Sequence, residues 1–230
     1  MLVRDWMSTN VVTIDADDSM MEAINMLKQN DIRMLPVMHK EKLVGIVTDR
    51  DLRSASASDA TALEIHELLY LMSKIKVRDI MTKNPITVPI DYTMEETAEI
   101  LLDNKISGVP VIDHDDKIAG VLTQTDILKM MIGVTGLTGK GHGRGIQFAF
   151  QAKDHPGAIK EISDIIRNYQ GRLASILSSY ENVPEGQRKV YIRVFDLDRE
   201  KLPELMEEIK KIATPLYMID HRSNKREIFQ

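Results

Sequence analysis

The sequence predicts a chain of mixed α/β (α+β) class, in which two copies of a β-α-β-β-α unit precede a separate domain of β-α-β-β-α-β order. Residues 3–37 align with residues 77–111 at a shift of 74 positions, and both segments begin with Val-Arg-Asp and end with Pro-Val. The repeat stops before residue 145, where a new alternation of strand-like and helix-like patterns begins. With 230 residues, the chain is long enough for two hydrophobic cores.

The composition is that of a globular protein without disulfides. Apolar residues make up 43% of the chain and charged residues 28%, and there is no cysteine. The net charge of −5 and the pI near 5.7 argue against binding to nucleic acid or to a membrane surface, because both need a basic face. No apolar run approaches membrane-spanning length and Met1 is not followed by a signal-peptide core, so we expect a cytoplasmic protein.

Each copy of the repeat ends in the same short motif, a glycine and two branched apolar residues followed by Thr-x-x-Asp. The motif contains Thr48 and Asp51 in the first copy and Thr123 and Asp126 in the second. A strand that passes into a helix there would offer free N–H groups and a hydroxyl to a phosphate, and the carboxylate could accept both hydroxyls of a ribose. Thr-x-x-Asp is also an ordinary helix cap, but its occurrence at the same place in both copies favours a nucleotide site.

The rest of each copy contains consistent strand and helix signals. Short strands are predicted at 11–14 and 86–88, and capping boxes open with Ser19 and Thr93. The helices that follow should end near Asn30 and Asn104, which tolerate a left-handed cap. Strands at 34–38 and 109–112 each contain a proline, which is typical of a short or edge strand. The last strands should run over 42–48 and 117–123, directly before the motifs.

Both copies resemble CBS domains, and residues 1–132 resemble one CBS pair, or Bateman module. The resemblance implies an adenine nucleotide as a regulatory ligand, with no catalytic cofactor and no metal. It assigns phosphate or ribose oxygens to the threonines and the ribose hydroxyls to the aspartates. It also implies that apolar residues enclose the adenine, namely Ile14, Met34, Pro36 and Val37 in the first site, and Val88, Ile106, Gly108 and Pro110 in the second.

The two predicted sites differ in charge. Arg50 lies inside the first motif, where Thr125 occupies the matching position of the second, and Arg33 corresponds to Ser107. A guanidinium can hold a phosphate through two hydrogen bonds. We therefore expect the first site to prefer the phosphorylated ligand, and the second to hold a less charged ligand, to bind more weakly or to use cations from elsewhere. The alternative is that both arginines are solvated surface residues.

Two segments connect these units and the last domain. Residues 59–76 should contain a connecting helix at about 61–74, where His66 is expected to be packed, after a Ser-Ala run that is either a hinge or a helix end. Residues 133–145 contain six glycines and are predicted to be a linker. They do not form a phosphate-binding loop of the G-x-x-x-x-G-K-[ST] type, because Lys140 is followed by Gly141, although Lys140, His142 and Arg144 are candidates for a phosphate contact. The predicted domains are then 1–58, 77–132 and 146–230.

The β-α-β-β-α-β order of residues 146–230 is ferredoxin-like. The sequence Asp154-His155-Pro156-Gly157 at the first strand-to-helix turn resembles the ligand-binding loop of ACT domains. The resemblance implies an amino-acid effector, whose carboxylate would be held by backbone N–H groups near Gly157 and Ala158. The alternative is that Asp154 caps a helix that has a proline in its first turn.

The order CBS-CBS-ACT is similar to that of bacterial acetoin-utilization CBS-ACT proteins, which implies an association with acetoin breakdown. We expect a homodimeric allosteric sensor that binds AMP, ADP or ATP, with NAD and S-adenosylmethionine as further candidates, and an amino acid in the ACT-like domain. The alternatives are a scaffold that binds no nucleotide and, less favoured, an enzyme. No catalytic residues are assigned, because the sequence contains neither H-E-x-x-H nor G-x-S-x-G.

Overall fold

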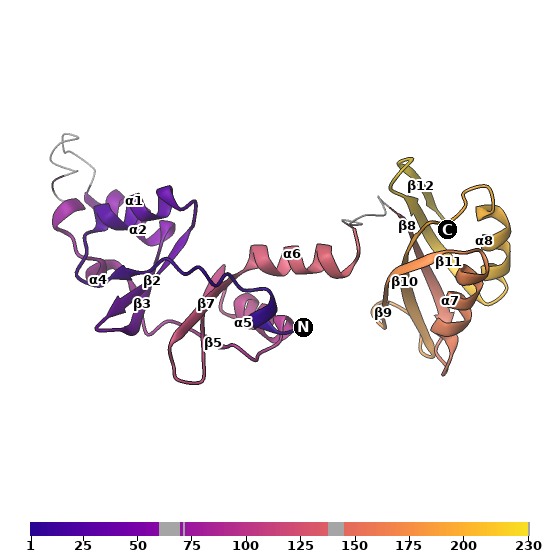
Figure 1. The fold of residues 1–230 in the computed structure, drawn as a ribbon, viewed down its shortest axis with the longest axis horizontal. Coiled ribbons are helices and arrows are strands. Elements are labelled where there is room, and N and C mark those ends of the chain that lie inside the picture. Colours follow the sequence, from indigo (N-terminus) through magenta and orange to yellow (C-terminus); the bar gives the residue numbers. More distant parts are fainter. Residues whose placement is uncertain (60–69, 71, 138–144, 230) are drawn as a thin grey trace. The chain divides into compact units, whose positions relative to one another are not determined.

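The computed structural model describes residues 1–59, 70, 72–137 and 145–229, which form two compact units. The first unit comprises Met1–Leu128 and the second Lys129–Gln230. No helix among the described residues is long and apolar enough to cross a membrane. Figure 1 labels the elements of both units.

The first unit contains the two predicted repeats. A short 3-10 helix, Val3–Asp5, precedes the first repeat, which comprises β1 (Ile14–Asp15), α1 (Met20–Gln29), β2 (Met34–His39), β3 (Lys42–Thr48) and α2 (Asp49–Asp59). The second repeat comprises α4 (Val77–Ile80), β4 (Thr82–Lys83), β5 (Val88–Pro89), α5 (Met94–Asp103), β6 (Gly108–Ile112), β7 (Ile118–Thr123) and α6 (Gln124–Val134). The Ser-Ala run is part of α2, while most of the predicted connecting helix, including His66, lies outside the described residues.

The beginning of each repeat adds to the sheet of the other repeat. Strand β4 pairs antiparallel with β3, so that the first sheet has the order β1-β2-β3-β4. In the second sheet, of order β5-β6-β7, Ser8 forms an isolated bridge with Val121 of β7. The duplication in the sequence therefore produces two repeats. The first segment of each repeat pairs with the sheet of the other, so that together they form the first unit.

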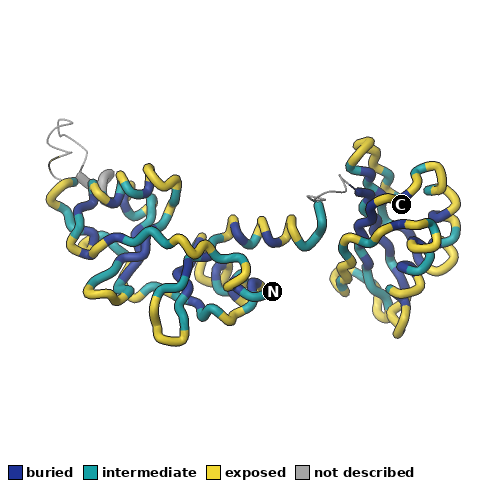
Figure 2. Tube along the Cα trace, viewed as in Figure 1, coloured by how far each residue is buried: buried dark blue, intermediate teal, exposed yellow. Residues whose placement is uncertain are grey.

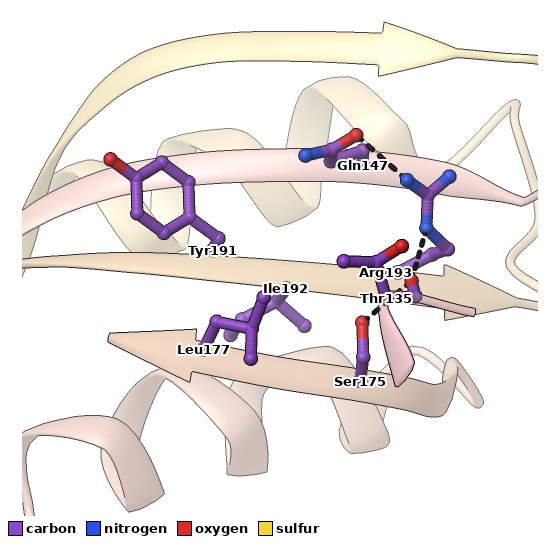
Figure 3. Close-up of a pocket in the computed structure, with 7 residues that line it drawn as sticks. All are labelled: Thr135, Gln147, Ser175, Leu177, Tyr191, Ile192 and Arg193. Carbon is purple, nitrogen blue, oxygen red and sulfur yellow. Dashed lines mark hydrogen bonds between the residues drawn. The ribbon is translucent and has the colours of Figure 1, made fainter. Parts of the chain in front are cut away.

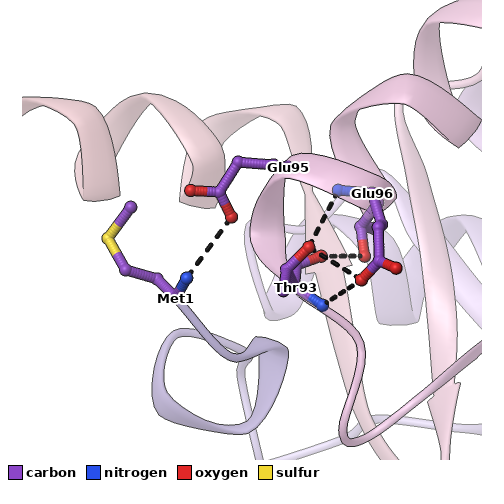
Figure 4. A network of polar contacts seen from close by, with 5 residues as sticks. Met1, Thr93, Glu95 and Glu96 are labelled. Carbon is purple, nitrogen blue, oxygen red and sulfur yellow. Dashed lines mark hydrogen bonds and ion pairs between the residues drawn. The ribbon is translucent and has the colours of Figure 1, made fainter. Parts of the chain in front are cut away.

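The two predicted capping boxes are confirmed. Glu96 Oε2 accepts hydrogen bonds from Thr93 N at 2.8 Å and from Thr93 Oγ1 at 2.7 Å, while Glu96 N donates to Thr93 Oγ1 at 3.1 Å. Figure 4 shows this network beside the amino group of Met1, which pairs with Glu95 at 3.4 Å. Ser19 and Glu22 form the same box at α1. The bond from the Thr93 backbone lowers the pKa of Glu96, because it stabilises the carboxylate.

The helix ends correct one expectation. Asn30 and Asn104 cap α1 and α5, but their φ angles are −97° and −91°, and the left-handed residues are the next ones, Asp31 and Lys105. The reason is that each asparagine side chain donates to the carbonyl four residues earlier at 2.8 Å and so closes the last turn itself.

The prolines in β2 and β6 lie in short strands of six and five residues, which is one of the two expected settings. Neither strand is at an edge, because each lies between two neighbours in its sheet. Strand β1, however, begins its pairing with β2 at Val37, and β5 begins its pairing with β6 at Val111. Pro36 and Pro110 therefore lie just before the segment that pairs with β1 or β5, and on the other side they face Ile46 of β3 and Val121 of β7.

The second unit has the predicted β-α-β-β-α-β order. Its elements are β8 (Ile146–Lys153), α7 (Ala158–Asn168), β9 (Arg172–Ser179), β10 (Gln187–Phe195), α8 (Leu202–Lys210) and β11 (Ala213–Asp220), followed by an additional strand, β12 (Lys225–Ile228). The sheet has the order β12-β11-β8-β10-β9 with antiparallel neighbours throughout, which is the ferredoxin-like topology with one added edge strand. Figure 2 shows its buried core, which contains Phe148, Phe150, Ile162, Ile192 and Leu205.

The predicted linker begins later than expected. Gly133 lies in α6, and Gly136 takes a left-handed φ of 68° just after the helix. Gly136 N donates to Gly133 O at 3.0 Å and Leu137 N to Ile132 O at 3.3 Å, the two bonds of a Schellman motif. Helix α6 is therefore closed by its own backbone, while residues 138–144, with Lys140, His142 and Arg144, lie outside the described residues.

Candidate functional site

Thr48 and Asp51 form a hydrogen-bonded pair where β3 passes into α2. Asp51 Oδ2 accepts from Thr48 N at 2.8 Å and from Thr48 Oγ1 at 2.7 Å, and Asp51 N donates to Thr48 Oγ1 at 3.3 Å. The helix-cap interpretation of the motif is therefore correct for this structure. The hydroxyl proton points at the carboxylate, so the hydroxyl can bind a phosphate as a donor only after that bond breaks.

The second motif has nearly the same geometry. Asp126 Oδ2 accepts from Thr123 N at 3.0 Å and from Thr123 Oγ1 at 2.7 Å, and the aspartate is buried, with 7% of its surface exposed. A carboxylate has about four lone-pair positions on two oxygens. The two bonds that each threonine donates end on one carboxylate oxygen, Oδ2. For Asp51, helix capping and the binding of a ribose diol are therefore compatible roles.

Only glycine fits at its position in each motif, because a methionine of the other repeat occupies the space that a larger side chain would need. A Cβ atom on Gly45 would lie 2.5 Å from Met81 Sδ and 2.9 Å from Thr82 O. A Cβ atom on Gly120 would lie 2.5 Å from Met7 Sδ. Both methionines precede the segments that cross to the other sheet, so each motif is held in place by the other repeat. The sequence signal for this contact is the repeated Asp-x-Met at residues 5–7 and 79–81, which pattern analysis did not connect with the glycines.

The predicted adenine walls divide into core residues and residues at the contact between the repeats. Ile14 and Val37 are partners across β1 and β2 and belong to the hydrophobic core of the first repeat, as Val88 does in the second, where it is fully buried. Met34 and Gly108 contact each other across the repeats, because a Cβ on Gly108 would lie 3.3 Å from Met34 Cε. Pro36 and Pro110 are buried and Ile106 is half-buried.

Arg33 and Arg50 are exposed, and the backbone of residue 33 lies at the start of α2. Asp49 N donates to Arg33 O at 3.2 Å, which places the backbone of residue 33 beside the first turn that contains Arg50. In the second repeat, Gln124 N donates to Ser107 O at 3.0 Å, and the neighbouring Thr125 is exposed. The two repeats therefore have the same backbone arrangement here, with arginines at two positions of the first repeat and neutral residues at the matching positions of the second.

The first repeat contains a group of possible metal ligands that was not predicted from the sequence. Ligand atoms of Asp15, Asp17 and His39 lie within 4.8 Å of one another. Local bonds account for the two carboxylates, because Asp15 Oδ1 accepts from Asp17 N at 2.8 Å and Asp17 pairs with Arg78. Both aspartates are exposed, so the arrangement has the geometry of an ordinary surface turn.

The predicted loop of the second unit lines a surface hollow of about 440 Å³. The lining consists of residues 154–160 and Arg188 of β10. Gly157 takes a φ of 99° and is the N-cap of α7, with no side-chain cap bond. The proposed capping role of Asp154 is therefore wrong, since Asp154 Oδ1 lies 3.1 Å from Arg188 Nε instead. Ala158 N donates to His155 O at 3.1 Å and Glu161 N to Gly157 O at 2.9 Å, so the Ala158 amide, which was expected to receive a carboxylate, is already bonded in this structure.

A smaller hollow of about 20 Å³ lies on the face of this sheet that carries Gln147, Tyr191 and Arg193 (Figure 3). Arg193 is 5% exposed and donates to Thr135 O at 2.7 Å and to Gln147 Oε1 at 2.9 Å. Burial lowers the pKa of its guanidinium, because the charged form loses water. Ser175 Oγ also donates to Thr135 O, at 2.9 Å, so these bonds hold residue 135 against the sheet within the second unit.

The chain belongs to the CBS domain-containing proteins. The CBS domain family model matches residues 3–58 and 77–133. A CBS domain-containing protein of Dictyostelium discoideum is 34% identical over 134 residues, which are 58% of this chain and 92% of that protein. An inosine-5'-monophosphate dehydrogenase of Methanocaldococcus jannaschii is 35% identical over 121 residues, but the match covers 52% of this chain and 21% of that enzyme.

Solved structures show the same tandem arrangement. The CBS domain pair of protein MJ0100, in complex with 5'-methylthioadenosine and S-adenosyl-L-methionine, is 32% identical with a TM-score of 0.50 and covers 58% of this chain and 97% of that chain. The AcuB protein of Vibrio cholerae, whose name refers to acetoin utilization, is 24% identical with a TM-score of 0.51 and covers 61% and 97%. At that identity the likeness shows the fold alone. The first unit is therefore a tandem CBS pair.

Proposed function

We propose that the CBS pair binds an adenine-containing ligand and that the protein is a regulatory sensor. The observation that carries this proposal is the pair of matching strand-to-helix junctions, each with a buried or half-buried aspartate held in a fixed position by its threonine. Support also comes from the MJ0100 pair, which binds two adenosine derivatives on a similar fold. The candidate ligands are AMP, ADP, ATP, NAD and S-adenosylmethionine.

A binding test must show whether Asp51 and Asp126 only cap their helices or also bind a ligand. Asp51→Asn together with Asp126→Asn keeps a carbonyl oxygen that can accept the threonine bonds, but it removes the second acceptor for a ribose diol. Glu22→Gln together with Glu96→Gln is the matched control, because it removes the same two charges from the capping boxes of α1 and α5, for which no ligand is proposed. We expect the ligand affinity to fall at least about tenfold in the first variant and to stay unchanged in the control.

Thermal unfolding with and without each ligand gives the first readout, and titration calorimetry the second. A ligand at about 100 times its dissociation constant should stabilise the folded protein by about 2.7 kcal/mol. If no ligand on the panel raises the melting temperature, the scaffold alternative is correct. If the aspartate double variant binds as tightly as the native protein, the motifs are helix caps only. Turnover of a nucleotide during the titration would instead indicate an enzyme.

The first site is proposed to prefer a phosphorylated ligand, because Arg50 lies in the first turn of α2 and the backbone of Arg33 bonds to the start of that helix. The second repeat supplies the control substitutions, since Ser107 and Thr125 occupy the matching positions. A variant with Arg33→Ser and Arg50→Thr should bind AMP and adenosine with similar affinities at the first site. An unchanged preference for AMP would show that the two arginines are solvated surface residues.

The second candidate function is the binding of an amino-acid effector in the 440 Å³ hollow of the second unit. Its support is the N-terminus of α7, which begins with a left-handed glycine and has no side-chain cap. Calorimetry with the common amino acids tests this, with Arg188→Gln as the variant and Arg172→Gln as a control at a second Arg–Asp pair. We expect binding of one amino acid that weakens in the Arg188 variant only, and no binding by any amino acid would reject this function.

The regulatory mechanism follows from thermodynamic linkage. A ligand shifts a conformational equilibrium only by its different affinities for the two states. A typical coupling of about 1–3 kcal/mol between CBS and C-terminal ligands would act equally in both directions, through contacts in a homodimer. An association with acetoin utilization is supported only by the resemblance in domain order, because the likeness to the Vibrio cholerae protein shows the fold alone.

A further inference from the structure

The charge of the chain is divided unevenly between its two units. The first unit contains 13 lysines and arginines and 22 aspartates and glutamates, whereas the second contains 17 and 13. The second unit is therefore basic, with a net charge of +4, although the whole chain carries −5. The argument from net charge against a polyanionic partner thus holds for the first unit but not for the second.

One face of the C-terminal sheet carries both helices of the second unit (Figure 1). Ile162 of α7 and Leu205 of α8 share one core with Phe148 of β8. Side chains alternate along a strand, so the residues next to Phe148 point to the opposite face. On that opposite face, one row of paired residues crosses all five strands, in the order Ile228, Tyr217, Ala149, Tyr191 and Leu177.

This row combines aromatic rings with basic surroundings. Two half-buried tyrosines flank the alanine, and the aliphatic side chains at the sheet edges are exposed, Leu177 by 43% and Ile228 by 80%. The charged strand residues that share this face are all basic, namely Lys153, Lys189, Arg193 and Arg226. Lys153 and Arg226 are exposed. Within the five described strands, no carboxylate lies on this face.

Hydrogen bonds hold the row in place. Gln147 Nε2 donates to Tyr217 Oη at 3.2 Å, while Gln147 Oε1 accepts from Arg193 at 2.9 Å. Arg193 also donates to Thr135 O at 2.7 Å. The ring of Tyr217 is therefore fixed before a ligand arrives, which lowers the entropy cost of binding.

We propose that this face of the sheet binds single-stranded nucleic acid. Bases stack on Tyr191 and Tyr217, because an aromatic ring offers a surface that any base can cover, and phosphates lie near Lys153 and Arg226. A duplex does not fit this chemistry, since its bases are stacked on one another and closed to the tyrosines. An acidic polypeptide would pair with the basic residues but would leave the two rings without a role.

Fluorescence anisotropy of the full chain with a labelled single-stranded RNA of about eight nucleotides and mixed sequence tests the proposal. Single-stranded DNA of the same sequence and an RNA duplex are the comparison probes. We expect at least one of the single strands to bind, and the duplex to bind at least about fivefold more weakly. Tyr191→Ala and Tyr217→Ala should each weaken binding of the single strand at least about fivefold, whereas Tyr191→Phe should keep it. Tyr180→Ala is the control, because Tyr180 is 59% exposed but lies outside the row.

A second pair of variants tests the phosphate contacts. Lys153→Gln together with Arg226→Gln should weaken binding and lower the slope of log affinity against log salt by roughly 1–2. Arg167→Gln together with Lys210→Gln removes the same charge from α7 and α8, on the other face of the sheet, and should leave both quantities unchanged. Circular dichroism checks that all variants fold.

Several results would overturn the proposal. These are no binding of either single strand, equal binding of the duplex, or affinities that the two tyrosine-to-alanine variants leave unchanged. Displacement of the probe by a polyglutamate peptide as readily as by unlabelled RNA would show that the face binds acidic polypeptide by charge alone. The variant with Asp51→Asn and Asp126→Asn should bind the probe like the native protein, and loss of binding there would place the RNA in the CBS pair instead. The sensor function is tested with mononucleotides, so the two proposals fail or succeed separately.

Discussion

Replacing Gly120 by alanine should destabilise the CBS pair through its contact with the other repeat. The new Cβ would lie 2.5 Å from Met7 Sδ, 2.9 Å from Met7 Cγ and 3.0 Å from Ser8 O. Overpacking of this kind costs about 1–3 kcal/mol. The loss of glycine entropy in the unfolded chain offsets about 0.5–1 kcal/mol. We therefore expect the free energy of unfolding to fall by about 1 kcal/mol, between limits of about 0 and 2.5 kcal/mol.

A double-mutant cycle with Met7→Ala tests the assigned cause. Removing the methionine side chain relieves two of the three close approaches, so the double variant should be more stable than the two single effects predict, by about 1–2 kcal/mol. The matched pair Gly45→Ala and Met81→Ala should show a similar rescue. There too, two of the three close approaches come from the methionine and the third comes from a backbone oxygen, Thr82 O at 2.9 Å.

Urea unfolding followed by tryptophan fluorescence measures these effects in the relevant unit. Trp6 is the single tryptophan of the chain, and it stands next to Met7 in the first unit. The signal therefore reports on the CBS pair even if the second unit unfolds separately. The reasoning is refuted if Gly120→Ala is as stable as the native protein, or if the effects of Gly120→Ala and Met7→Ala add without coupling.

Other substitutions test the second unit. Gly171→Ala should lower the free energy of unfolding by about 1–3 kcal/mol, because its Cβ would lie 2.7 Å from Ile166 Cγ2. Gly186→Ala has no atom within 4 Å of the new Cβ and should cost only the strain of its φ of 74°, about 1 kcal/mol. Urea unfolding followed by circular dichroism compares the two variants. The hydrogen bond from Arg199 holds the pKa of Asp220 well below its usual range. Asp220 therefore stabilises the fold above the unfolded-state pKa of about 3.9, and this contribution is lost as the pH falls below that value. Asp220→Asn should flatten this acid dependence in unfolding measured from about pH 6 to about pH 2, and an unchanged slope would contradict the assignment.

The sequence predicted the repeat, the capping boxes and the element order of both units because these depend on local patterns. Ser19 and Thr93 stand three residues before a glutamate, and that spacing defines a capping box without tertiary information. The left-handed helix ends were placed one residue too early, at Asn30 and Asn104. An asparagine at a helix end can either take a left-handed φ itself or donate its side chain to the carbonyl four residues earlier. The sequence is the same in both cases, and the structure shows the second.

The contacts between the repeats could not be predicted from the sequence. Nothing local to Gly120 indicates that Met7, more than a hundred residues away, occupies the space of its missing side chain. Arg188 was missed for the same reason, since its position beside Asp154 depends on the pairing of β8 with β10. Strand β12 was missed because its four residues are mostly charged, and only its pairing with β11 makes it a strand.

The hydrogen bonds of the two motifs do not by themselves distinguish a nucleotide site from a helix cap. Thr48 with Asp51 and Ser19 with Glu22 make the same three bonds at nearly the same distances, yet a ligand is proposed for the first pair only. The distinction must therefore come from the surrounding residues. Met34 meets Gly108 across the two repeats, so the adenine walls of both proposed sites share one contact. Because of this shared contact, a purine that displaces Met34 in one site also changes the wall of the other, and the two sites should not bind independently.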